Sequence, residues 1–194
     1  MPILGSVASQ NTKTFLFAPS GAYDSIATAT VSNGTTQTIT FSSIPATYTH
    51  LQLRYIVRTN RSDDYSDAIG IRFNSDTGSN YYRHHFGTEG SWTSSGGSSG
   101  SDAQYHIQAA TALSLANTFG NGVIDIFDYA NTIKQKTTRS LGGNNNNTSN
   151  QDWLLFASSL WRNTSAINTI DLKVNYGTYY AVGSKIALYG IKGA

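Results

Sequence analysis

Three aspartates are crowded into the stretch NRSDDYSD, and carboxylates at this density could hold a hard cation such as calcium. They are Asp63, Asp64 and Asp67. Their spacing matches no established calcium-binding loop, and Arg58 and Arg61 lie beside them in the sequence to neutralise the charge. We therefore expect a solvated loop between two strands, with a bound ion as the alternative.

The four histidines are the other side chains of the metal-binding type. His84 and His85 are adjacent, so in a strand they point to opposite faces and cannot chelate one ion together. His106 could approach one of the two, whereas His50 stands alone in the sequence. We expect structural or exposed histidines, no metal site and no cofactor.

Catalytic signatures are absent from the sequence. It contains no Gly-x-Ser-x-Gly, no phosphate-binding loop, no His-Glu-x-x-His and no dinucleotide fingerprint. Glycoside hydrolysis needs two carboxylic acids across a cleft, and any pair could be chosen from Glu89, Asp125, Asp128, Asp152 and Asp171. For Asp125 and Asp128 we expect capping or pairing with Lys and Arg across a hairpin. The sequence therefore predicts no enzyme and no catalytic residue.

The elements that must position these side chains are β-strands. Glu occurs once, helix start and stop signals are scarce, and Thr, Tyr, Val and Ile recur with period two. Residues 50–59 show the clearest alternation, with Leu51, Leu53, Tyr55 and Val57 predicted to point inward. We predict an all-β chain with about nine or ten strands, folded as a single antiparallel β-sandwich over residues 22–194.

Two hairpins are predicted. Residues 123–143 form two strands that turn on Ala130-Asn131, the first apolar on both faces, as in the middle of a sandwich, and the second with one solvated face. Asn33-Gly34 is a turn signal that predicts pairing of residues 23–31 with residues 35–41.

Composition limits the partners. Charged residues make up 12% of the 194-residue chain and the net charge is +2, so nucleic acid is not an expected partner. Hydrophobic residues make up 39%, enough for a core, and there is no cysteine for a disulfide or a thiolate metal site. No stretch has the features of a secretory signal or a membrane span, so we expect synthesis in a cytoplasm and no membrane partner.

Residues 1–21 are predicted to form an N-terminal arm outside the sandwich. An arm with an apolar clump, here Phe15-Leu16-Phe17, docks on its own domain or on a neighbouring subunit. Two polar stretches are predicted to be exposed tips. One is the Gly/Ser-rich segment 91–101, in which Trp92 either makes a contact or folds back onto the sheet, and the other is 142–151, with four consecutive asparagines from Asn144 to Asn147.

Five phrases of the chain together look like those of a known family. They are Ile39-Thr-Phe-Ser-Ser-Ile-Pro45, Tyr48-Thr-His-Leu-Gln-Leu53, Arg72-Phe-Asn-Ser-Asp-Thr-Gly-Ser-Asn-Tyr81, residues 124–143, and Ala187-Leu-Tyr-Gly-Ile-Lys-Gly193. They resemble small β-rich virion structural proteins of tailed bacteriophages. The match spans residues 23–193 and leaves out the arm, and its strand-and-turn phrases have no catalytic content.

Within that family, proteins of this size and composition are similar to capsid decoration, or cement, proteins. The resemblance implies a jelly-roll-like sandwich with an extended arm, a homotrimer, and a place on the head surface of a virion assembled in a bacterial host. It also implies that the partner is the major capsid protein, gripped by Phe15, Leu16 and Phe17.

The alternative is a tail or fibre protein that binds a host-surface glycan or receptor. Its contact surface would be the loops around Trp92 and Asn144 to Asn147. A sugar-stacking platform could be supplied by Tyr81, Tyr82, Trp92, Tyr179 and Tyr180. The alternative for these aromatic residues is a place in the core or in the cover of the sheet.

Overall fold

The computed structural model describes residues 22–146 and 152–193. All the regular secondary structure in those ranges is β-strand. Phe15, Leu16 and Phe17 of the predicted arm, and Asn147, lie outside the described residues. Among the described residues, no helix is long and apolar enough to cross a membrane. The strands are β1 (Tyr23–Thr30), β2 (Thr38–Phe41), β3 (His50–Val57), β4 (Ser66–Phe73), β5 (Tyr81–Glu89), β6 (Trp92–Ser101), β7 (Gln104–Ala110), β8 (Gly120–Phe127), β9 (Lys136–Asn144), β10 (Trp153–Trp161), β11 (Ile170–Val174) and β12 (Lys185–Ile191).

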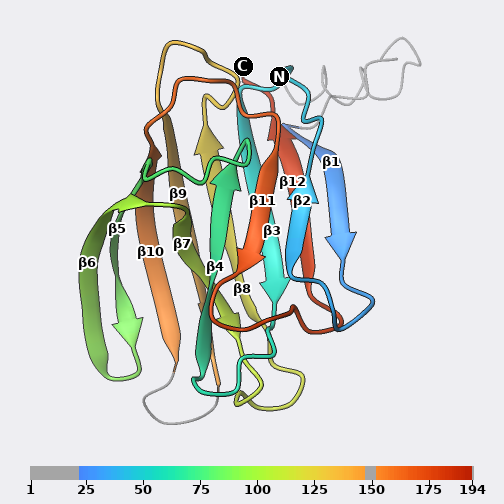
Figure 1. The fold of residues 1–194 in the computed structure, drawn as a ribbon, viewed down its shortest axis with the longest axis vertical. Helices are drawn as coiled ribbons and strands as arrows, with labels where there is room; N and C mark the ends of the chain where they lie inside the picture. Colours follow the sequence, from blue (N-terminus) through green and yellow to red (C-terminus); the bar gives the residue numbers. More distant parts are fainter. Residues whose placement is uncertain (1–21, 147–151, 194) are drawn as a thin grey trace, which may run out of the picture.

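These strands form two antiparallel sheets that pack face to face (Figure 1). One sheet has the order β1-β12-β3-β8-β9-β10-β5-β6, and the other has the order β2-β11-β4-β7. Four of the pairs are nested in the sequence: β1 with β12, β2 with β11, β3 with β8, and β4 with β7. Nested antiparallel pairs rolled into two sheets make a jelly roll. The predicted all-β, jelly-roll-like sandwich is therefore confirmed.

The other four strands are two insertions in that plan. β5 and β6 enter between β4 and β7, and β9 and β10 enter between β8 and β11. They pair in the order β9-β10-β5-β6 and extend the eight-stranded sheet beyond β8. We call these four strands the wing and the other eight the body. Figure 1 shows that β10, β5 and β6 lie beyond β7, the nearest edge of the four-stranded sheet.

Apolar side chains that point inward from both sheets form the hydrophobic core of the body. On β3, Leu51, Leu53, Tyr55 and Val57 are buried as predicted, whereas Ile56 on the opposite face is 53% exposed. Burial of such a set is the main favourable term in folding. The neighbouring strands β8 and β12 and the strands of the facing sheet contribute Ile69, Ile71, Ile107, Ile124, Ile126, Ile170, Leu172 and Leu188, all fully buried.

The hairpin predicted in residues 123–143 is confirmed as β8 and β9, with a wider turn than predicted. The Asn131 Oδ1 atom accepts hydrogen bonds from the backbone amides of Ile133 and Lys134. These bonds keep both residues in the turn, so that β9 begins only at Lys136.

The hairpin predicted at Asn33-Gly34 is wrong, because β1 and β2 lie in different sheets. The Asn33 side chain does make a turn, and its Oδ1 atom accepts bonds from the Thr35 amide and from the hydroxyls of Thr35 and Thr36. This turn carries the chain from one sheet to the other. Each strand then pairs with a partner from the end of the chain.

Both predicted polar tips also need correction. The Gly/Ser-rich segment is strand β6, which pairs with β5 at the edge of the sheet. Backbone pairing on one side is enough for an edge strand, so its lack of large side chains does not prevent a strand. Asn144 and Asn146 are almost fully buried, since their side-chain amides donate to the Tyr65 carbonyl, where the two sheets meet.

Candidate functional site

The wing is anchored to the body by an aromatic cluster at the ends of β4, β5 and β10. Phe73, Tyr81 and Trp161 are buried, with the Tyr81 and Trp161 rings stacked at a centroid distance of 6.3 Å. Asp76 accepts hydrogen bonds from the Trp161 indole at 2.7 Å, from the Asn80 amide and from the Gly78 backbone. Aromatic packing and hydrogen bonds therefore join the wing to the body at this point.

Hydrogen bonding also determines the direction in which the pKa of Asp76 is shifted. Partial burial alone would raise the pKa of this carboxyl. The bonds from Trp161, Asn80 and Gly78 favour the carboxylate and outweigh burial, so that the pKa lies below its usual value.

The inner face of β9 is polar. Lys136, Thr138 and Ser140 point inward and are almost fully buried. The Lys136 ammonium donates to the carbonyls of Asn131, Lys134 and Thr164, and burial lowers its pKa. The Thr138 hydroxyl donates to the Gln104 side-chain carbonyl at 3.0 Å. These bonds satisfy polar groups that would otherwise oppose burial.

The outer face of the wing, in contrast, carries exposed apolar side chains. Leu141 of β9, Phe156 of β10 and Phe86 of β5 lie directly opposite one another in the strand register, and Leu154 lies beside them on β10. Their exposed fractions range from 46% for Phe156 to 61% for Phe86. We call these four residues the outer patch. Apolar side chains in neighbouring positions on paired strands make one continuous surface.

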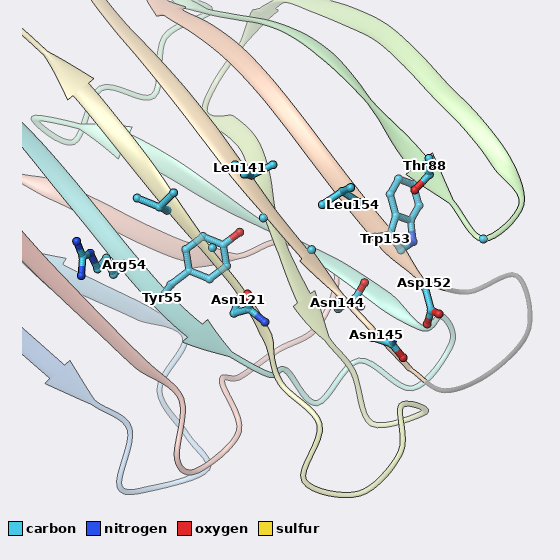
Figure 2. Close-up of a pocket in the computed structure, with 15 residues that line it drawn as sticks. Arg54, Tyr55, Thr88, Asn121, Leu141, Asn144, Asn145, Asp152, Trp153 and Leu154 are labelled. Carbon is cyan, nitrogen blue, oxygen red and sulfur yellow. The ribbon is translucent and has the colours of Figure 1, made fainter.

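A hollow adjoins the outer patch on the same face (Figure 2). Its volume is about 690 Å³, and it crosses β3, β8, β9 and β10. Figure 2 shows Leu141 and Leu154 at its side, with Arg54, Asn121, Trp153 and Asp152 around the rest. The hollow joins an apolar wall to a few polar groups, as small binding sites do.

Glycines let the sheet lie flat over the ring of Tyr55. A Cβ atom at Gly142 would meet the Tyr55 hydroxyl at 1.9 Å, and one at Gly122 would meet it at 2.4 Å. These two glycines pair across β8 and β9. Only glycine permits this approach, and burial raises the pKa of Tyr55 well above its usual value.

A second hollow lies on the inner side of the wing, and we call it the inner groove. Its volume is also about 690 Å³. β5 and β6 supply Arg83, His85, Ser94 and Ser98 to one wall, and β7 supplies Tyr105 and Gln108 to the other. Arg61, Asp64 and Tyr176 also line the groove. The lining is mostly hydroxyl, amide and guanidinium groups, with one carboxylate and the apolar side chains of Trp153 and Leu155.

The groups of the inner groove interact with one another. The Arg83 guanidinium donates to the backbone carbonyl of Tyr105, and burial lowers its pKa. Burial and the neighbouring Arg83 and His84 lower the pKa of His85, whose Nε2 atom lies 3.4 Å from the Ser94 hydroxyl. The Arg61 guanidinium lies 4.5 Å from the centre of the Tyr176 ring. His85 is therefore neutral at neutral pH, and Arg83 carries the charge.

The three clustered aspartates do not converge on one point. Asp63 and Asp64 form ion pairs with Arg61 at 2.7 and 3.2 Å. Asp67 is fully buried and accepts bonds from the Thr59 hydroxyl and from the backbone of residues 176 and 177. The described residues hold no group of three or more candidate ligands placed to bind a metal.

Arg58 does not neutralise this cluster as expected. Its guanidinium donates to the backbone carbonyls of Ser114, Leu115 and Thr118, and it thereby fixes the loop that leads from β7 to β8. Of the two arginines, Arg61 provides the expected neutralisation, and it does so for Asp63 and Asp64.

The histidines lie as the strand pattern predicts. On β5, His84 is exposed on the outer face, whereas His85 faces the inner groove. The Nδ1 atom of His50 accepts a hydrogen bond from the Asp128 amide at 3.0 Å. The side chain of His106 lies outside the part of the chain that the structure describes.

The aspartates considered as glycosidase candidates all serve as acceptors within the fold. Asp128 pairs with Lys134 across the turn, as expected, while Asp125 accepts from Gln52 on the neighbouring strand. Asp152 accepts from the Asn146 backbone, and Asp171 from the Thr40 and Ser75 hydroxyls. For Glu89, burial and the charge of Asp64 raise the pKa.

The aromatic platform considered for sugar binding does not form. Tyr81 and Tyr180 are fully buried core residues, and Tyr82 and Tyr179 are half-buried. Trp92 is different, since it lies at the turn between β5 and β6 and is 74% exposed. It does not fold back onto the sheet.

Arg83 and the outer patch were not singled out from the sequence. The signal for the patch is present in WLLFASSLW, where Leu154 and Phe156 alternate with Leu155 and Ala157, so that both faces of β10 are apolar. No comparable local signal marks Arg83. Its burial depends on β7, which lies across the groove from it.

No protein-family model matches this chain, and no curated protein matches it. Among solved structures, one from Bacteroides vulgatus that is described as a candidate pore-forming toxin aligns at 10% identity with a TM-score of 0.12. The alignment covers 83% of this chain and 60% of that one. A TM-score of this size does not establish a common fold, so we base no functional argument on it.

Proposed function

We propose that this protein is a structural component of a tailed-phage virion, and specifically a decoration protein on the outer surface of the head. The resemblance of residues 23–193 to phage virion proteins supports this proposal. The jelly-roll sandwich supports it as well, because capsid proteins are among those built on that fold. In this proposal the protein is synthesised in the cytoplasm of the bacterial host.

The outer patch is the observation that carries the proposal. Phe86, Leu141, Leu154 and Phe156 project from hydrogen-bonded strands, so they keep their positions without a partner. A contiguous exposed apolar surface on a soluble protein marks an interaction site. We infer that the major capsid protein covers this face in the virion.

Mass action explains how such binding would stabilise a head. A protein that binds only the assembled shell shifts the equilibrium toward that shell. Several contacts per protein would add avidity without raising the strength of any single contact. The arm, with Phe15, Leu16 and Phe17, and assembly as a homotrimer would supply such contacts.

Cosedimentation with shells that lack the protein tests the proposal. The full-length protein should bind in a saturable way, and deletion of residues 1–21 should abolish binding. The double change Phe86→Ser and Phe156→Ser should weaken binding by at least about tenfold, equivalent to about 1.4 kcal/mol. Ile56→Ser is the matched control, since Ile56 is equally exposed on the same sheet but belongs to the body.

Two results would overturn the proposal. One is a full-length protein with no affinity for shells, and the other is equal weakening by Ile56→Ser and by the double change. Circular dichroism of each variant establishes that it is folded.

The exposure of Trp92 favours a second candidate, a tail or fibre protein that binds a host-surface glycan or receptor. An aromatic ring at the tip of a strand pair can anchor a contact. In this case Trp92→Ala should weaken adsorption to host cells and leave shell binding unchanged. Under the decoration proposal, neither measurement should change.

A further inference from the structure

The inner groove contains a positive charge that lacks a negative partner. The guanidinium of Arg83 donates to the Tyr105 carbonyl, and its Nε atom is buried without a hydrogen-bond partner among the described residues. None of the described carboxylates forms an ion pair with it. A partly buried cation of this kind is stabilised by an anion, and a planar guanidinium suits a carboxylate best.

The other arginine of the groove is already neutralised. Arg61 pairs with Asp63 and Asp64, and it also donates to the Ser66 carbonyl. Asp64 also lines the groove, but it pairs with Arg61, so Arg83 is the cation of the described lining that forms no ion pair. This argues for a ligand with separated single charges and against a polyanion such as nucleic acid, which requires several basic side chains.

The remaining lining suits hydroxyl groups. Ser94 and Ser98 of β6, together with Gln108 and Asn175, provide side chains that both donate and accept hydrogen bonds. A ligand that carries many hydroxyls can use donors and acceptors in this mixture, whereas an apolar ligand would leave them unpaired.

One aromatic ring is placed to stack on a ligand. Tyr176 lines the groove and is 67% exposed, and Arg61 lies 4.5 Å from the centre of its ring. An exposed ring held in this way offers a flat apolar surface. A sugar ring has a complementary apolar face and hydroxyls around its edge, and a volume of about 690 Å³ is in the range of small-ligand sites.

We propose that the inner groove binds a carboxylate-bearing saccharide, with the carboxylate on Arg83, the hydroxyls on the serine and amide groups, and one sugar ring against Tyr176. This site lies on the opposite face of the wing from the outer patch, and it includes neither Trp92 nor the arm. The inference goes beyond the decoration function and does not rest on it.

Calorimetric titration of the purified full-length protein tests the inference. The probes are oligogalacturonate and 3′-sialyllactose, with the methyl ester of each as its neutral counterpart. At least one acidic probe should bind, and its ester should bind at least about tenfold more weakly, because the charge-assisted bond to Arg83 is lost.

Two variants assign this binding to the groove. Arg83→Gln should reduce acid-sugar binding to the level of the ester, whereas Arg162→Gln should not, because Arg162 bonds Tyr82 away from the groove. Tyr176→Ala should weaken binding of acid and ester alike, and it removes an exposed ring that the fold does not require. Tyr23→Ala, which removes another exposed tyrosine in contact with an arginine, is its control.

The inference is overturned if neither acidic probe binds, if acid and ester bind equally, or if folded Arg83→Gln retains full affinity. Shell cosedimentation of Arg83→Gln separates this result from the decoration proposal. Shell binding should be unchanged, since the outer patch is intact.

Discussion

The body and the wing share one eight-stranded sheet, yet the inner faces of their adjoining strands, β8 and β9, differ in kind. On β8, Ile124 and Ile126 point into the sandwich and are fully buried. Their direct partners on β9 are Ser140 and Thr138, which are also buried but polar. The change from an apolar to a polar interior takes place between two neighbouring strands.

The reach of the second sheet also differs between the two regions. The four-stranded sheet ends at β7, so the strands β10, β5 and β6 extend past its edge. Where the two sheets face each other, apolar burial stabilises the fold. On β9, hydrogen bonds such as that between Thr138 and Gln104 replace it, whereas on β10 both faces are apolar, with Leu155 buried and Phe156 exposed. Neighbouring strands of one sheet can thus differ in the polarity of their faces without interrupting the hydrogen-bond ladder.

The largest expected effect is on the free energy of unfolding, when an apolar side chain is truncated in the body and another in the wing. Ile124→Ala should lower the free energy of unfolding by about 3 kcal/mol, because it leaves a cavity in the body. Leu141→Ala, at the outer patch, should change it by no more than about 0.5 kcal/mol. Urea denaturation of the two variants measures the difference. Equal losses would show that the outer patch is already covered in the isolated protein.

A smaller effect is expected at the root of the wing. Asp76→Asn weakens the bonds from Trp161, Asn80 and Gly78, and it should cost about 2 kcal/mol at neutral pH. Because the folded-state pKa of Asp76 is lowered, this stabilisation is complete above the ordinary carboxyl pKa and is lost as pH falls through the folded-state value. The variant should therefore lose less stability than the wild type on acidification below about pH 4.

Thermal denaturation between neutral and acidic pH measures this difference. Asp24→Asn is the control, because it removes an exposed ion pair with Lys192 and should have little effect at either pH. A wild-type acid transition that stays unchanged in Asp76→Asn would exclude this carboxyl as a contributor.

The smallest expected effect tests the polar interior of the wing. Thr138→Val removes the hydrogen bond to Gln104 and should cost about 1 kcal/mol, even though valine is more apolar and similar in size. Thr137→Val, on the exposed face of the same strand, should be close to neutral. A rise in stability for Thr138→Val would show that the interior of the wing behaves like that of the body.

The sequence predicts the body better than the wing. Alternation on β3 and β11 identifies the buried faces, because each strand there has one apolar and one polar side. In the wing, residue type does not tell which face is buried. Lys136 and Thr138 are polar but buried, and Phe156 is apolar but exposed.

Apart from the β8–β9 hairpin, the pairing partners named here were beyond local prediction. Asn33 makes the local turn that its type favours, but the strands on either side join different sheets. The Gly/Ser-rich β6 is a strand only because β5 lies beside it. Arg83 gains its place in a groove from β7, which follows it by two strands. These features depend on tertiary neighbours, which no local pattern specifies.

The nested topology also governs the order in which the protein can fold. β1 pairs with β12, from Tyr23 opposite Ile191, and β2 pairs with β11, so the first two strands wait for the last two to be synthesised. Closing such long loops costs chain entropy before any contact repays it, which slows folding. In contrast, β5 and β6 are joined by a short turn and can pair as soon as both have left the ribosome. The β5–β6 hairpin of the wing therefore has a local route to structure, whereas the jelly roll closes only after its final strand is made.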